Sequence, residues 1–118
     1  MFLESIGYTA TLIEYVARQT GRSAPDIATV IGRTKIFNLC HNAPMNRLLP
    51  IKQIAREIII DNYLNAPEWS DVLVANERYG AKIEKLVDAT TDDKREYTNE
   101  LFDLLTVKHP LIEVSMEE

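Results

Sequence analysis

Cys40 and His41 are the only neighbouring residues in this chain that combine a nucleophile with a base. Adjacent residues of a helix point about 100° apart, because one turn holds roughly 3.6 residues. The thiol and the imidazole are therefore not expected to share a hydrogen bond. Cys40 also falls on the apolar side of its segment, where a free cysteine usually packs as a small hydrophobic residue. We expect Cys40 to be structural, and the sequence indicates no catalytic residue.

The sequence offers equally little for metal ligation. The two histidines are His41 and His109, and neither a Cys-x-x-Cys nor a His-x3-His spacing occurs. The neighbouring acids Asp92 and Asp93 stand at an expected helix start, where they are predicted to cap the helix rather than act as a general acid and base. There is no glycine-rich phosphate loop. We therefore expect no metal and no cofactor.

A helix-turn-helix spacing is the strongest pattern in the chain. Ala17, Gly21 and Ile27 follow its order of small residue, turn glycine and apolar anchor on the second helix. The hairpin over residues 12–33 could thus bind DNA, although Asp26 would bring the wrong charge towards phosphate. The same spacing suits any tightly packed helical hairpin, so DNA binding is the alternative hypothesis. The side chains it would use are Arg22, Thr29, Arg33 and Lys35.

Charge is unevenly distributed along the 118 residues, whose net charge is −5. Residues 15–56 contain seven Lys and Arg against one Asp, which gives +6, and residues 68–118 contain six against thirteen acids, which gives −7. The two segments could attract each other within the fold or across a dimer, or the basic segment could face an acidic partner. Two solvated faces are the simplest interpretation.

Hydrophobic periodicity predicts an all-α chain of about five or six helices. Residues 42–46, which include Pro44, are expected to form a loop, and Asn65–Pro67 a short turn. We expect a compact orthogonal bundle in one domain. The expected helices span 3–19, 23–32 with its caps, 34–41, 50–64, 70–89 and 92–106. The expected parts are a four-helix half (1–64), a C-terminal helical pair (68–110) and a frayed tail (111–118).

A stripe of apolar residues along 72–86 has a spacing close to that of a coiled coil. Trp69 stands at its start, and tryptophan is enriched among interface anchors. The stripe could equally pack on the first half of the chain, with Trp69 closing the junction. The predicted protein-binding residues are Trp69, Tyr79 and Ile83, and the stripe would also serve a homodimer.

Short motifs in the first half resemble a group of small uncharacterised bacterial helical proteins, some of which are similar to toxin–antitoxin components. The residues that carry the resemblance are Tyr15, Thr20-Gly21, Ser23, Asp26-Ile27, Leu39-Cys40-His41 and Ile58 to Tyr63. The chain departs from that pattern around Asn42–Leu49. The resemblance implies a bacterial or phage protein that works by binding.

These features together favour a non-enzymatic helical protein that binds another protein, as a regulator, inhibitor or antitoxin-like module. Nucleic acid is the alternative partner. No run of about 18 apolar residues occurs, so no membrane partner is expected. The start of the chain lacks the basic and apolar regions of a secretory signal, and Cys40 is the only cysteine. A reducing cytoplasm is the expected location.

Overall fold

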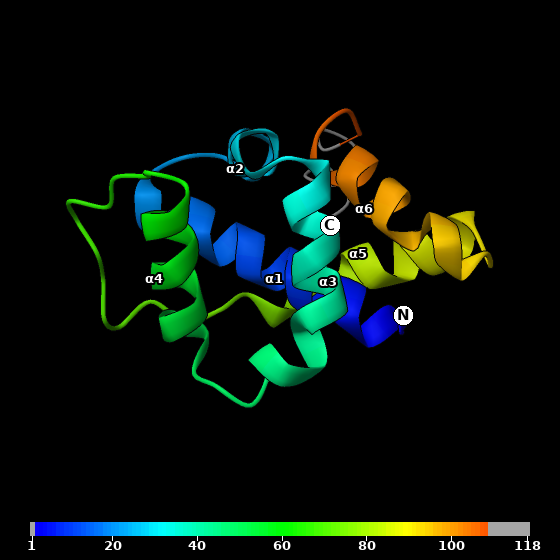
Figure 1. Cartoon of the computed structure of the whole chain (residues 1–118), viewed down its shortest axis with the longest axis horizontal. Coiled ribbons are helices and arrows are strands. Elements are labelled where there is room, and N and C mark those ends of the chain that lie inside the picture. The colour runs from blue at the N-terminus through cyan, green and yellow to red at the C-terminus, as the bar shows by residue number, and fades with distance from the viewer. Residues whose placement is uncertain (1, 109–118) are drawn as a thin grey trace.

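The computed structural model describes residues 2–108 (Figure 1). Within that range the chain forms helices and connections and no strand. The all-α prediction and the expected number of helices are confirmed. The elements in order are α1 (Leu3–Thr20), α2 (Ala24–Ile31), α3 (Arg33–Asn46), α4 (Ile51–Asp61), α5 (Glu77–Thr90), the 3-10 turn η1 (Lys94–Glu96) and α6 (Tyr97–Leu105). The predicted tail at 111–118 lies outside the described residues.

Two glycines form the sharp turns between the first three helices. Gly21 ends α1 with φ 70°, and Gly32 joins α2 to α3 with φ 86°. Residues other than glycine rarely adopt a positive φ. A substitution at either position would therefore strain the backbone. The Ser23 hydroxyl accepts a hydrogen bond from the Asp26 N–H and caps α2, as the sequence predicted. α3 consequently runs steeply across α1 (Figure 1).

α3 continues through residues 42–46, so the predicted loop there is wrong. Pro44 lies in the last turn of this helix, where it removes one backbone hydrogen bond. Cys40 and Ala43 are fully buried on the inner face, and the Arg47 N–H bonds to the Ala43 carbonyl. The burial of Cys40 and Ala43, both before the proline, therefore outweighs the single lost hydrogen bond.

The predicted helix over 70–89 is wrong in its first part, because α5 begins only at Glu77. The polar backbone of the preceding segment bonds to α1 instead of to itself. The Gln19 side-chain amide donates to the Ser70 carbonyl at 2.8 Å and accepts from the Ser70 N–H at 2.9 Å. Arg18 donates to the Val74 carbonyl. These contacts hold the irregular segment against the end of α1.

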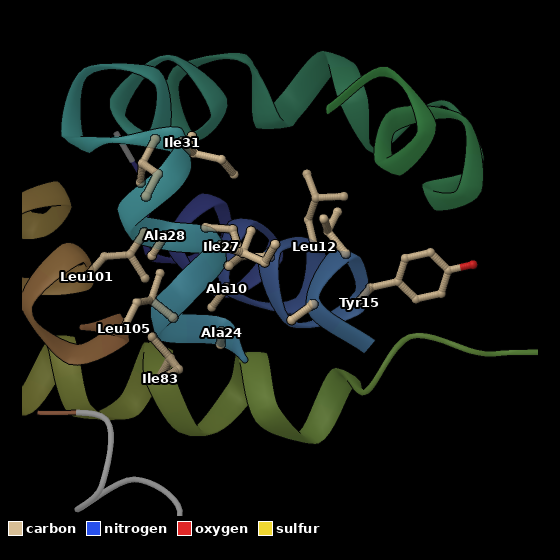
Figure 2. Packing of buried hydrophobic residues seen from close by; sticks show 14 of the residues in the cluster. Ala10, Leu12, Tyr15, Ala24, Ile27, Ala28, Ile31, Ile83, Leu101 and Leu105 are labelled. Carbon is tan, nitrogen blue, oxygen red and sulfur yellow. The ribbon is translucent and has the colours of Figure 1, made fainter. Parts of the chain in front are cut away.

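α1 is the central helix of the core, and its most extensive pairing is with α5. Ile6, Leu12 and Ile13 on α1 are fully buried, and buried residues from all six α-helices form one apolar cluster with them. In Figure 2, Leu101 and Leu105 of α6 lie between the ribbons of α6 and α2. The C-terminal helices thus share the core of the first four.

Candidate functional site

The structure places Tyr79 and Ile83 in the core, where their exposed fractions are 5% and 0%. Both lie on the face of α5 that also buries Val87. Val72, which was expected to begin the same stripe, lies before α5 and is 87% exposed. Within the predicted 72–86 stripe, Tyr79 and Ile83 therefore face the core and are not presented to a partner in this fold. The homodimer stays a prediction.

Trp69 is partly buried and engaged within the fold. Its ring meets Tyr15 edge-on, with centroids 6.2 Å apart, and the Arg56 guanidinium lies 4.6 Å above it. The indole N–H donates to the Asp71 carboxylate at 3.0 Å. Trp69 thus closes the junction between α1, α4 and the irregular segment before α5.

Two of the four residues in the DNA-binding hypothesis lie on or just before α2. The Arg22 guanidinium is 3.2 Å from the Asp26 carboxylate, one helical turn ahead. The Thr29 hydroxyl donates to the Pro25 carbonyl at 2.8 Å. Asp26, which was expected to repel phosphate, therefore pairs with Arg22, one of the cations of the predicted site.

The other two residues of that hypothesis point to different neighbours of α3. Arg33 lies 4.6 Å above the Phe102 ring and 3.8 Å from the Asp103 carboxylate, both on α6. The Lys35 ammonium donates to the Asn62 side chain at the end of α4, at 3.0 Å. The four predicted DNA contacts are thus engaged in separate local interactions.

Cys40 and His41 lie on different sides of α3, as expected. Cys40 is 1% exposed, and burial raises the pKa of its thiol to about 11, although hydrogen bonds with Thr9 and Thr98 act in the opposite direction. His41 is exposed and stacks on Phe37, with ring centroids 6.2 Å apart. The two side chains cannot act as a nucleophile and base together.

An exposed apolar row runs along the outer side of α3, which we call the α3 stripe. It consists of Phe37, His41 and Met45, with Leu48 in the turn that follows the helix. Phe37 is 49% exposed, Met45 70% and Leu48 78%. On an ideal helix their positions fall within about 80° of arc. The opposite side of α3 carries the buried residues Ile36, Cys40 and Ala43.

The α3 stripe lies in a stretch without negative charge. Residues 27–56 contain five Lys and Arg and no acid. Arg33 and Arg56 pair with carboxylates from the second half of the chain. Arg47 and Lys35 have no ion pair among residues 2–108. The fold therefore pairs part of the basic segment with carboxylates, and it places Arg47 in a pocket with glutamates and Lys35 in one with Asp61.

A pocket of about 260 Å³ borders the α3 stripe on the side of α4. Asn38 and Asn42, which follow Phe37 and His41 in sequence, lie on its wall. Its apolar part comes from Ile31, Leu39 and Ile58, and Lys35 and Asp61 supply opposite charges. The pocket is large enough for one side chain of a partner.

A second pocket of about 480 Å³ lies between α1, α5 and the connection that follows α3. Arg47 lines it together with Glu4, Glu77 and Glu84. The Tyr8 hydroxyl oxygen is buried and finds no hydrogen-bond partner within residues 2–108. Burial raises the pKa of Tyr8, and Arg47 acts in the opposite direction. The described residues include no cluster of His, Cys, Asp and Glu that could hold a metal.

The α3 stripe was not predicted from the sequence, because the helix was expected to end at residue 41. Phe37, His41 and Met45 are spaced four residues apart, which is the signal of one helical face. The loop expected over 42–46, around Pro44, concealed that signal. A proline near the end of a helix is compatible with it where burial compensates for the lost hydrogen bond.

Comparisons with protein-family models, curated proteins and solved structures found no match. The resemblance to toxin–antitoxin components stays a prediction. None of the helices in residues 2–108 is long and apolar enough to cross a membrane.

Proposed function

We propose that this chain acts by binding another protein, without catalysis, and that the partner covers the α3 stripe. The observation that carries the proposal is the exposure of Phe37, Met45 and Leu48 in one row, while the opposite side of α3 is packed in the core. Contiguous exposed apolar residues on a folded protein are typical of interaction sites. Such binding would make the chain a small regulator, inhibitor or antitoxin-like module of the cytoplasm.

The energetics of the stripe fit this role. Fully burying one large apolar side chain contributes about 1.5–3 kcal/mol. Met45 and Leu48 are mostly exposed, so a partner would gain most of that amount at each. Met45 is also unbranched and adapts to irregular partner surfaces. Micromolar affinity corresponds to about 8 kcal/mol after the entropic cost of association, so the partner must also make contacts beyond Phe37, Met45 and Leu48.

DNA binding is the second candidate, favoured by the five cations and missing acids of residues 27–56. The local pairing of Arg22 with Asp26 and of Arg33 with Asp103 reduces the charge available to phosphate. Protein binding has the stronger support, because the exposed row on α3 is apolar rather than basic.

The test is affinity capture with the immobilised full chain from an extract of its source cells. Met45→Asp should raise the Kd for the captured partner by about 30-fold, because about 2 kcal/mol of burial is lost and a charge enters the interface. The matched control is Val72→Asp, which makes the same chemical change at another exposed apolar residue outside α3. If the Met45→Asp chain captured the same protein as well as the Val72→Asp chain does, the proposal would be contradicted.

A further inference from the structure

We propose that residues 62–76 form a strap that opens as one unit while the helices stay folded, and that Gln19 is the latch that holds it closed. The strap joins α4, which ends at Asp61, to α5, which begins at Glu77. It contains turns but no helix or strand. A connection longer than about 12 residues without secondary structure is uncommon in a compact domain, and such connections are usually lids or binding loops. This device is separate from the docking of a partner on the α3 stripe and does not depend on it.

The strap is held against the fold by side chains rather than by its own backbone. Among residues 2–108, the backbone hydrogen bonds of the strap lie at its two ends, next to α4 and α5. Between these ends, three side chains of α1 and α4 supply the partners of its backbone groups, and they are Arg18, Gln19 and Lys52. The strap can therefore leave the surface without breaking the hydrogen bonds of any helix. Segments with this kind of attachment open at a lower free energy than the core does.

Gln19 is the strongest of these attachments because it is buried, with an exposed fraction of 4%. Its amide bonds to both the N–H and the C=O group of Ser70, and it also donates to the Tyr15 hydroxyl at 3.1 Å. The ion pair between Arg56 and Asp71, at 3.4 Å, is exposed on both sides, and such pairs contribute little in water. Without Gln19, the two Ser70 groups would lack partners in the closed form and regain water in the open form. Loss of the latch therefore favours opening.

The strap covers one end of α1. Its partly buried apolar residues pack against the core, and they are Leu64, Ala66, Trp69, Leu73 and Ala75. The Trp69 ring meets the Tyr15 ring, whose residue has an exposed fraction of 0%. In Figure 2 the Tyr15 ring extends away from the labelled side chains of α2 and α6. Opening of the strap therefore uncovers an aromatic ring that the closed chain does not present.

Tyr63 is the hinge at the α4 end of the strap. It is the only non-glycine residue with a positive φ, 55°, among residues 2–108. This left-handed conformation costs free energy in a residue that has a Cβ atom. The Tyr63 side chain is 95% exposed, so its own packing does not offset that cost. Opening releases the strain, because the chain can then leave α4 in an ordinary conformation.

The test is relaxation-dispersion NMR of the full chain, which detects minor states that exchange within microseconds to milliseconds. Resonances of residues 64–75 and the Trp69 indole should fit one exchange rate and one open population, while the middle of α5 shows no exchange. Gln19→Met keeps the size of the side chain but removes its hydrogen bonds, so it should raise the open population at least about tenfold. The matched control is Gln53→Met, the same change at an exposed position of α4, which should leave the population unchanged. Tyr63→Gly should lower the population about threefold, because glycine adopts the closed conformation without strain.

Acrylamide quenching of the single tryptophan provides a second measurement on the same chains. Quenching of Trp69 should increase in Gln19→Met and stay at the wild-type level in Gln53→Met. Three results would overturn the proposal. They are flat profiles in both the wild type and Gln19→Met, unrelated exchange rates along 64–75, and the same exchange in the middle of α5, which would indicate global unfolding. If Gln19→Met did not fold, an open population unchanged by Tyr63→Gly would contradict the hinge and with it the strap.

Discussion

Gly80 of α5 packs directly against Gly7 of α1. A Cβ atom on Gly80 would lie closer than 3.0 Å to the Gly7 carbonyl oxygen and to the Thr11 hydroxyl. Both glycines are fully enclosed by their neighbours in the crossing of α1 and α5. Since this pairing is the most extensive in the fold, the absence of two side chains sets the distance between its two main helices.

Gly80→Ala should lower the free energy of unfolding by about 1–3 kcal/mol, because the new methyl group must push α5 away from α1. At an unconstrained position inside a helix the same substitution stabilises a protein by roughly 0.5–1 kcal/mol. The test is therefore whether Gly80→Ala lowers or raises the free energy of unfolding. Urea denaturation followed by circular dichroism measures this change. An Ala variant more stable than the wild type would show that the helices are further apart than described.

Trp69→Ala should destabilise the fold by about 2–4 kcal/mol, since the indole contacts the Tyr15 ring and supports the Arg56 guanidinium. Thermal unfolding measures the loss. Val72→Ala is the control, because Val72 is exposed in the same segment and its truncation should leave the melting temperature unchanged. If Trp69→Ala kept full stability but weakened partner capture, Trp69 would be an interface residue, as the sequence first suggested.

Cys40 should react with iodoacetamide at pH 8 at least about 100-fold more slowly in the folded chain than in denaturant. The pKa of about 11, raised by burial from 9.0, lowers the reactive thiolate fraction by that factor, and burial also blocks access. A cysteine introduced by His41→Cys in a Cys40→Ala chain is the exposed control on the same helix. Rapid labelling of native Cys40 would contradict its placement in the core.

The same pKa shift predicts a loss of stability at high pH. The unfolded chain releases the Cys40 proton near pH 9.0, whereas the folded chain holds it to about pH 11. The contribution of this thiol to stability is therefore complete below pH 9.0 and declines as the pH rises towards 11. Urea unfolding of the wild type and of Cys40→Ala between pH 9.0 and 11 tests this prediction. The Cys40→Ala chain should lack the part of the fall in unfolding free energy that the thiol causes.

The all-α class was predictable because apolar spacing and caps such as Ser23 act locally. The position of α5 was not, because the irregular segment before it depends on Gln19, which lies 51 residues from Ser70 in sequence. The continuation of α3 through Pro44 likewise depends on the burial of Ala43, a tertiary effect.

The burial of two predicted protein-binding residues also depends on tertiary packing and could not be predicted from the sequence. Tyr79 and Ile83 form an apolar stripe whether it faces a partner or the core, and only packing against α1 decides between the two. The spacing of Phe37, His41 and Met45 was visible in the sequence. Its exposure was not, because a helix with one buried and one apolar outer face gives no clean amphipathic pattern.

Fluorescence anisotropy with mixed-sequence DNA tests the alternative function. We expect no binding tighter than about 10⁻⁴ M at physiological salt, because local acids already pair Arg22 and Arg33. Arg33→Gln is the informative variant, since Arg33→Glu would place a second carboxylate beside Asp103 and disturb the fold. Micromolar binding that weakens steeply with salt and with Arg33→Gln would favour DNA.

The methyl resonance of Met45 tests the central claim most directly. It is recorded in the labelled full chain before and after addition of the captured partner, with the Trp69 indole N–H as an internal reference. The account predicts that the Met45 signal shifts or broadens at saturation while the Trp69 signal stays in place. An unchanged Met45 signal in a saturated complex would show that the partner binds elsewhere and that the α3 stripe is not the docking surface.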